Sequence, residues 1–156
     1  MKIRLLLAGK TAVHISEGMA IYEKRLKFYT SIETRIIPEI RLSKSMDTAR
    51  LKSAESAAFM KQVKDSDYLI LLDEQGRMFT SSGFAKLIEN HLTGAKNEVV
   101  FAIGGAHGFD ESIKRRANLI LSLSSLTFPH QLARLIFTEQ LYRAFTIIRN
   151  EPYHHT

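Results

Sequence analysis

Apolar and polar positions follow one another along the chain in blocks that predict strands separated by helices. Short apolar runs predict five strands, at Lys2–Ala8, Ile32–Pro38, Tyr68–Leu72, Val99–Ile103 and Leu119–Leu123. Apolar residues at helical spacing predict the helices Val13–Phe28, Asp47–Lys64, Ser82–Leu92, Asp110–Arg116 and Pro129–Arg149. This alternation is typical of a parallel sheet with helices on both faces, so the predicted fold class is α/β.

The last predicted helix, Pro129–Arg149, is apolar around most of its circumference. Its apolar residues are Leu132, Ala133, Leu135, Ile136, Phe137, Leu141, Tyr142, Ala144, Phe145, Ile147 and Ile148. A helix with one face in water shows a single apolar stripe, so this helix is either central in the core or buried against another subunit. Because the chain is short, we favour a dimer interface.

Length and composition bound the possibilities further. The chain has 156 residues with 45% hydrophobic content, enough for one domain, residues 1–156, with a substantial core. The absence of Cys excludes a disulfide framework, a thiolate metal site and a cysteine nucleophile. The first apolar run is too short for a signal peptide, and no stretch approaches the roughly 18 to 20 apolar residues of a membrane span. We therefore expect a soluble, cytoplasmic protein with no membrane contact.

The formal net charge of +6 is concentrated in the first third of the chain. Residues Met1 to Lys61 include 12 Lys/Arg against 6 Asp/Glu. Such an excess favours polyanions such as RNA through counterion release, but it carries no information about chemistry.

Three loops follow the predicted carboxyl ends of strands, where ligands of open α/β sheets bind. They are Leu72–Gly76, Gly104–Gly108 and Leu123–Phe128. Their convergence would form a pocket with apolar walls from Leu72, Leu123 and Leu126. We therefore predict a ligand site at this edge of the sheet.

The glycine-rich loop Gly104–Gly108 has two interpretations. Its open backbone could approach a ligand closely, or it could be a tight turn that needs positive φ. It fits neither G-x-G-x-x-G nor G-x-x-x-x-G-K-[ST], and no lysine follows the glycines. The pocket therefore suits an adenosine moiety better than a triphosphate.

Polar residues near the pocket and on the last helix have ordinary structural explanations. Asp73 and Glu74 are expected to be solvated residues of a turn at Glu74–Arg77, because neighbouring side chains at a strand end point in different directions. Glu139 and Arg143 are spaced for an ion pair on one helix face, which explains them as well as a substrate role for Arg143 does.

The chain ends in Tyr153, His154 and His155. A short histidine tail is most often exposed or mobile. Alternatively, the aromatic ring could stack on a base while an imidazole orients or moves a proton. Two adjacent histidines make no useful metal site without other ligands.

Four segments read together resemble one known family. They are Gly104-Gly105, Leu121-Ser122-Leu123-Ser124-Ser125-Leu126-Thr127-Phe128-Pro129-His130, Glu139-Gln140-Leu141-Tyr142-Arg143-Ala144 and Pro152-Tyr153-His154. The family is RlmH, the bacterial large-subunit ribosomal RNA (pseudouridine N3)-methyltransferases of the SPOUT superfamily, and the resemblance covers the whole chain. It implies a SPOUT-type parallel sheet with a C-terminal deep trefoil knot, and a homodimer. The knot is implied by resemblance alone, since general topology rules argue against knots.

The resemblance also implies which residues bind S-adenosylmethionine and what is methylated. Donor contacts are expected from Leu72, Gly104, Leu123, Ser124, Ser125, Leu126, Thr127 and Phe128. The implied reaction is methylation of N3 of a pseudouridine in 23S rRNA, within the large subunit or the assembled 70S ribosome, with no metal. Ala106–Phe109 lies in a segment that varies in this family, and we assign no role to His107.

The resemblance places the remaining chemistry in the C-terminal part of the chain. Arg143, Tyr153 and His154 are the candidate catalytic and RNA-positioning residues, with His154 as a hypothetical proton acceptor. With no added RNA-binding domain, the catalytic domain itself must contact RNA. We expect Lys24, Arg25 and Lys27 of the first helix to contact phosphates beside the partner's pocket.

Two rival functions remain at this point. One is a non-catalytic ribosome- or RNA-binding protein of the same fold, which calorimetry with S-adenosylmethionine would separate from the enzyme. The other is a nucleotide-dependent phosphotransferase that uses the Gly104–Gly108 loop. The missing loop lysine and Ser/Thr partner count against it.

Overall fold

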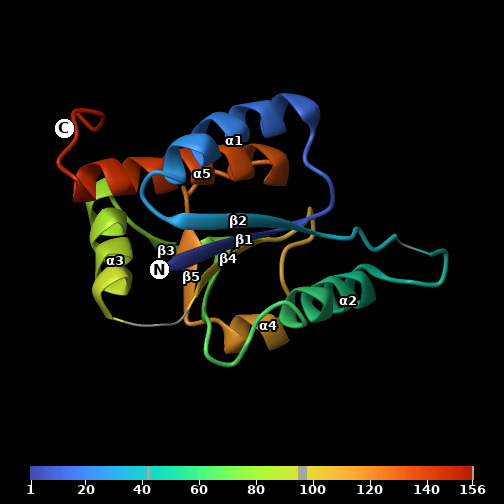
Figure 1. Cartoon of the computed structure of the whole chain (residues 1–156). Coiled ribbons are helices and arrows are strands. Elements are labelled where there is room, and N and C mark those ends of the chain that lie inside the picture. Colours follow the sequence, from blue (N-terminus) through green and yellow to red (C-terminus); the bar gives the residue numbers. More distant parts are fainter. Residues whose placement is uncertain (42, 95–97, 156) are drawn as a thin grey trace.

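The computed structural model describes residues 1–41, 43–94 and 98–155, and in these ranges the strands form one parallel sheet (Figure 1). The strands are β1 (Lys2–Ala8), β2 (Ser31–Ile37), β3 (Tyr68–Met78), β4 (Val99–Ile103) and β5 (Leu119–Ser122). Their order is β2-β1-β4-β3-β5, and each neighbouring pair is parallel. The predicted α/β class and parallel pairing are confirmed.

Helices cover both faces of the sheet. They are α1 (Val13–Leu26), α2 (Thr48–Met60), α3 (Ser81–Gly94), α4 (Glu111–Arg116) and α5 (His130–Ile148). Side chains of α1, α3 and α5 pack on one face, and those of α2 and α4 pack on the other. Asp47 and Asp110 cap α2 and α4 by accepting backbone N–H bonds, so these helices begin one residue later than predicted.

Strand β1 shows how the apolar pattern divides between the two faces. Ile3, Leu5 and Leu7 pack under α1, α3 and α5, whereas Leu6 and Ala8 face α2 and α4. Because successive side chains of a strand point to opposite faces, a strand covered on both sides is apolar throughout. The continuous run of leucines in β1 is explained by this two-sided burial.

Helix α5 lies beside α1 and also packs against α3 on the same face of the sheet. Its buried residues include Phe137, Leu141 and Phe145. Much of the apolar circumference is therefore covered within the chain, which is the first of the two explanations given for it. The dimer interface that we favoured from the sequence stays a prediction.

The prediction that the third strand ends at Asp73 and is followed by a turn at Glu74–Arg77 is wrong. β3 continues to Met78, and after a register shift Arg77 and Met78 pair with β5. Gly76 makes this possible, because a Cβ there would lie 2.7 Å from the backbone of Ile120. The glycine serves a close backbone approach rather than a tight turn.

The knot implied by the resemblance stays a prediction.

Within the described ranges, no helix combines the length and the apolar content that a membrane crossing requires.

Candidate active site

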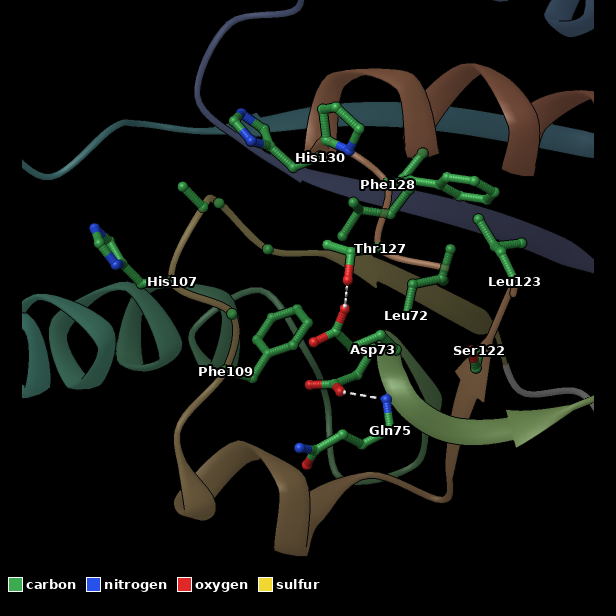
Figure 2. Close-up of a pocket in the computed structure, with 18 of the residues that line it drawn as sticks. Leu72, Asp73, Gln75, His107, Phe109, Ser122, Leu123, Thr127, Phe128 and His130 are labelled. Atoms are coloured by element: carbon green, nitrogen blue, oxygen red, sulfur yellow. Dashed lines mark hydrogen bonds between the residues drawn. The ribbon is translucent and has the colours of Figure 1, made fainter. Parts of the chain in front are cut away.

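A pocket of about 740 Å³ lies at the carboxyl ends of β3, β4 and β5 (Figure 2). It is lined by the three segments predicted to follow strands, of which Leu72–Gln75 is part of β3, together with residues of α2, α4 and α5. The lining residues are Lys52, Leu72–Gln75, Ile103–Phe109, Lys114, Leu121–Ser124, Leu126–His130 and Ala133. The predicted convergence of the three loops is confirmed.

Most of the residues expected to bind the methyl donor line this pocket. They are Leu72, Gly104, Leu123, Ser124, Leu126, Thr127 and Phe128. Ser125 is exposed and is not among the lining residues. Leu126 is 69% exposed, so this apolar side chain lies at the rim rather than deep inside.

Asp73 is partly buried, which corrects the expectation that it is a solvated turn residue, whereas Glu74 is exposed as expected. Asp73 forms an ion pair with Lys114 at 3.4 Å, and its Oδ1 accepts the Gln75 backbone N–H at 2.9 Å. Glu74 Oε2 accepts the Thr127 hydroxyl at 2.7 Å. Because Glu74 belongs to β3 and Thr127 to the loop after β5, this bond joins two walls of the pocket (Figure 2).

The glycine-rich loop is both a tight turn and a pocket wall. Gly108 has φ of +72°, which only glycine adopts readily. The Gly105 backbone N–H donates to Glu55 Oε1 of α2 at 2.8 Å, which fixes the loop against that helix. A Cβ at Gly104 would approach the ring of the buried Phe109 to 3.3 Å. The two interpretations of this loop are therefore compatible.

His130, the first residue of α5, adds an imidazole to the pocket. Burial lowers its pKa, and the positive charge of Arg134 lowers it further, whereas Glu55 and Glu39 act in the opposite direction. The net shift is downward, which favours the neutral imidazole.

Two neighbours of His130 tie the start of α5 to the loop between β1 and α1. Gln131 accepts the Ala12 backbone N–H at 2.9 Å and donates to the Lys10 carbonyl at 3.0 Å. The fully buried guanidinium of Arg134 donates to the carbonyls of Ala8 and Gly9 and to the Thr11 hydroxyl. The position of His130 is therefore fixed by several elements.

The three predicted catalytic residues come together around Glu139. Its Oε1 accepts from Arg143 Nη2 at 2.5 Å and from the Tyr153 hydroxyl at 3.1 Å. The guanidinium of Arg143 lies 4.8 Å from the centroid of the Tyr153 ring, and its Nη1 lies 3.4 Å from His154 Nδ1. The predicted Glu139–Arg143 pair is confirmed, and the tail is packed against α5.

The surroundings of Tyr153 and Arg143 raise the pKa of both groups. Burial raises the pKa of the Tyr153 hydroxyl, and hydrogen bonds with Tyr22 and Glu139 add to the shift. The hydrogen bond to Glu139 raises the pKa of Arg143. Tyr153 is therefore a neutral hydrogen-bond donor at ordinary pH, and Arg143 is a cation.

This cluster and the pocket lie at opposite ends of α5. His130 starts the helix and Arg143 is near its end, which separates them by roughly 20 Å along the axis at the usual helical rise. Figure 1 shows the C-terminal tail at the far end of α5, on the side where the N-terminus lies. Arg143, Tyr153 and His154 are not among the described residues that line the pocket.

Sequence reasoning missed the side chains of Lys52, Glu55 and Arg134. Lys52 and Glu55 lie on a helix whose pattern indicates only packing and solvent positions. Arg134 is one charged residue within an apolar helix. His130 is the last residue of the motif Leu121–His130 that carries the family resemblance, but its spacing from other residues did not indicate a role.

Known proteins resemble this chain in sequence and in fold. Residues 1–154 match the sequence model of a family described as "Predicted SPOUT methyltransferase". A protein of Christiangramia forsetii named "Ribosomal RNA large subunit methyltransferase H" is 44% identical, and one of the same name from Parabacteroides distasonis is 43% identical, each over 99% of both chains. A probable methylase family protein from Haemophilus influenzae has a similar fold, with TM-score 0.53 and 12% identity over 99% of this chain and 70% of that one.

Proposed function

The chain belongs to the SPOUT methyltransferase family, and on that premise we propose that it methylates N3 of a pseudouridine in the 23S rRNA of the large ribosomal subunit. The observation that carries this proposal is the pocket formed by part of β3 and the loops after β4 and β5, which contains seven of the eight residues expected to bind the donor. The name shared by the relatives supports large-subunit rRNA as the substrate. The pseudouridine and its N3 come from the family resemblance.

The pocket has the chemistry that S-adenosylmethionine requires. Its volume of about 740 Å³ lies within the ordinary range for ligand sites. Leu72, Leu123 and Phe128 offer apolar surface for the adenine, and the Gly104 backbone has no side chain to obstruct a close approach. The donor supplies a methyl group already activated on sulfur, and these residues would hold it.

Methyl transfer to ribosomal RNA tests the proposal directly. The purified protein should transfer labelled methyl from S-adenosylmethionine to ribosomes, large subunits or 23S rRNA of a strain that lacks this modification. Mass mapping should then place one new methyl group on a pseudouridine. Calorimetry should give a donor Kd in the micromolar range. Absence of donor binding at millimolar concentration would favour the alternative, a non-catalytic ribosome-binding protein of this fold.

We further propose a homodimer in which the tail of each copy completes the pocket of the other. The distance between the pocket and the Arg143 cluster within one chain supports this arrangement. So do the exposed apolar side chains of Val13, Ile21 and Phe28 on or just after α1, which are 72%, 54% and 84% exposed. Apolar surface of this kind favours association with another protein. A two-fold dimer would bring both sites together symmetrically.

In such a dimer the three tail residues take separate roles. Arg143, a cation held by Glu139, would orient an anionic part of the RNA. Tyr153 would stack on the target base. His154 would accept the imide proton, because a neutral imidazole nitrogen can act as a general base. His154→Ala should lower single-turnover methylation and change its pH dependence between about pH 6 and 9. An unchanged profile would exclude this role for His154.

Mixing two inactive variants tests the shared site. Leu123→Arg should abolish donor binding by placing a cation beside the sulfonium, and His154→Ala should remove the proton acceptor while donor binding is kept. Each alone should lose about 100-fold or more in activity. Exchange of subunits between them should restore activity in about one quarter of the sites, since half of the dimers are mixed and each has one intact site. No recovery, in samples whose sedimentation shows dimers, would contradict a shared site.

We also propose that Lys24, Arg25 and Lys27 contact RNA phosphates. All three are exposed at the end of α1, and Arg25 lies 5.4 Å from the ring centroid of Tyr142, on the side of the tail cluster. Reversing these charges should weaken ribosome binding and flatten its salt dependence while donor affinity is kept. Unchanged ribosome affinity would refute the assignment. A ribosomal substrate is also the reason to expect a cytoplasmic location.

A further inference from the structure

One side of the pocket is basic. Lys52 of α2, His107 of the loop after β4, and His130 of α5 all line it. Figure 2 shows His107 and His130 above and to the left of Asp73 and Gln75, which follow Leu72 in β3. The pocket therefore has a basic end and an acidic end, formed by different elements.

The acidic end is satisfied by groups of the protein itself. Asp73 pairs with Lys114, and Glu74 accepts the Thr127 hydroxyl. At the basic end, the described part of the chain contains no ion pair within 4.0 Å for Lys52, His107 or His130. Ion pairing within the described part of the chain therefore differs between the two ends of the pocket.

Two carboxylates act at the basic end of the pocket. Glu55 follows Lys52 by three residues on α2, so the two side chains share a helix face. Its Oε1 accepts the Gly105 backbone N–H. Glu39 also acts on His130 electrostatically, but burial and Arg134 outweigh both carboxylates. The lowered pKa favours the neutral imidazole of His130, which lines the same pocket as Lys52.

We infer that Lys52, His107 and His130 form a subsite for an anionic oxygen group next to the bound methyl donor. The group is either the carboxylate of the donor's amino-acid part or an RNA phosphate beside the target base. Both present oxygens to ammonium and N–H donors, which is the chemistry that these side chains recognise. The inference rests on the proposed function, because it concerns the same pocket. His130 is suited to the role because Gln131 and Arg134 fix the start of α5.

Binding measurements with two nucleosides distinguish the sources. S-adenosylhomocysteine has the carboxylate, whereas 5′-methylthioadenosine lacks the amino-acid part. If the carboxylate occupies the subsite, Lys52→Met and His130→Gln should each weaken S-adenosylhomocysteine about 10-fold, as expected for a hydrogen bond to a charged group, and leave methylthioadenosine unchanged. Lys61→Met is the matched control, because Lys61 ends the same helix and lines a different groove beside β2.

If a phosphate occupies the subsite, both nucleosides should bind the two variants as they bind the wild type. Ribosome affinity of Lys52→Met should then fall, with the slope of its salt dependence reduced by about one. Unchanged binding of nucleosides and ribosomes would overturn the inference, and so would an equal loss for both nucleosides, which indicates a distorted pocket. If the wild-type protein binds neither nucleoside, the proposed function fails instead.

Discussion

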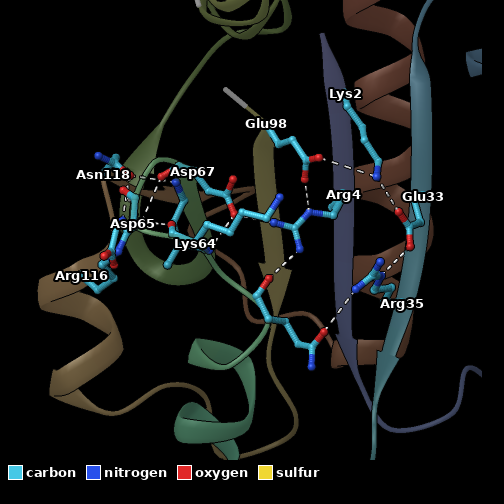
Figure 3. Close-up of polar contacts among 12 residues, drawn as sticks. Lys2, Arg4, Glu33, Arg35, Lys64, Asp65, Asp67, Glu98, Arg116 and Asn118 are labelled. Atoms are coloured by element: carbon cyan, nitrogen blue, oxygen red, sulfur yellow. Dashed lines mark hydrogen bonds and ion pairs between the residues drawn. The ribbon is translucent and has the colours of Figure 1, made fainter. Parts of the chain in front are cut away.

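The two ends of the sheet each bury an arginine, but the two guanidinium groups have different partners. At the amino ends of the strands, the buried guanidinium of Arg4 forms an ion pair with the buried Asp67 and another with Glu98, at 2.5 Å for the second (Figure 3). At the carboxyl ends, the equally buried Arg134 donates to carbonyls and a hydroxyl. Its hydrogen-bond partners include no carboxylate among the residues that the structure describes.

This difference separates stability from function. Positive and negative charges at the amino ends neutralise one another. That end of the sheet therefore attracts a charged ligand only weakly. Arg134 and Lys52 at the carboxyl ends add positive charge beside the pocket, at the edge where ligands of α/β sheets bind. We therefore expect variants at the amino ends to change folding alone, and variants at the carboxyl ends to change folding and binding together.

Asp67→Ala should have the largest effect on stability. It removes the carboxylate that pairs with Arg4 Nη2 and leaves Glu98 as the remaining carboxylate of this buried guanidinium. It also removes an acceptor for the Lys64 backbone N–H at 2.8 Å. The free energy of unfolding should fall by about 3–5 kcal/mol, measured by urea denaturation. Donor affinity of the folded variant should equal that of the wild type. The exposed Asp65→Ala is the control, and a parallel loss of donor affinity in Asp67→Ala would break the contrast between the two ends.

Arg134→Met should be less destabilising than Asp67→Ala, and it should also change the pKa of His130 in the pocket. The variant loses three hydrogen bonds but no longer buries a charge, so we expect a loss of about 1–3 kcal/mol. Because Arg134 lowers the pKa of His130, its removal should raise that pKa toward the ordinary value. NMR titration of His130 measures this shift, with the exposed Arg149→Met as control. A His130 pKa equal to that of the wild type would show that the two residues are not coupled.

The same contrast explains which features could be predicted from the sequence. The pocket could be predicted, because parallel strands place their carboxyl ends at one edge. The separation between His130 and Arg143 also follows from helical rise alone. Gly76 was misleading, because a glycine after polar residues indicates a turn, whereas here it meets the backbone of Ile120. The roles of Lys52 and Arg134 depend on which elements the fold brings beside them, and no local pattern contains that information.

Thr127→Val should have a moderate effect confined to the carboxyl ends. It removes the 2.7 Å hydrogen bond to Glu74 that joins the loop after β5 to β3, while the shape and volume of the side chain are nearly kept. The loss of one such bond, about 1 kcal/mol, should weaken donor binding about five-fold. Calorimetry with S-adenosylmethionine measures it, and Thr93→Val on α3 is a control outside the pocket. Equal donor affinities of wild type and Thr127→Val would show that the loop after β5 holds its position without this bond.

The smallest effect is expected at the exposed part of the amino-end network, where pH is the probe. Hydrogen bonds from Arg35 and then from Lys2 lower the pKa of Glu33 to about 2. A carboxyl group whose pKa is lower in the folded than in the unfolded protein stabilises the fold above its unfolded pKa, near 4.5, and this contribution is lost as pH falls toward 2. The melting temperature of Glu33→Gln should therefore lie below that of the wild type near neutral pH, and the two should converge between about pH 5 and 2. Because these pairs are solvent-exposed, added salt should reduce the difference at neutral pH. A difference that stays constant down to the acid limit would mean that Glu33 acts through packing rather than through its charge.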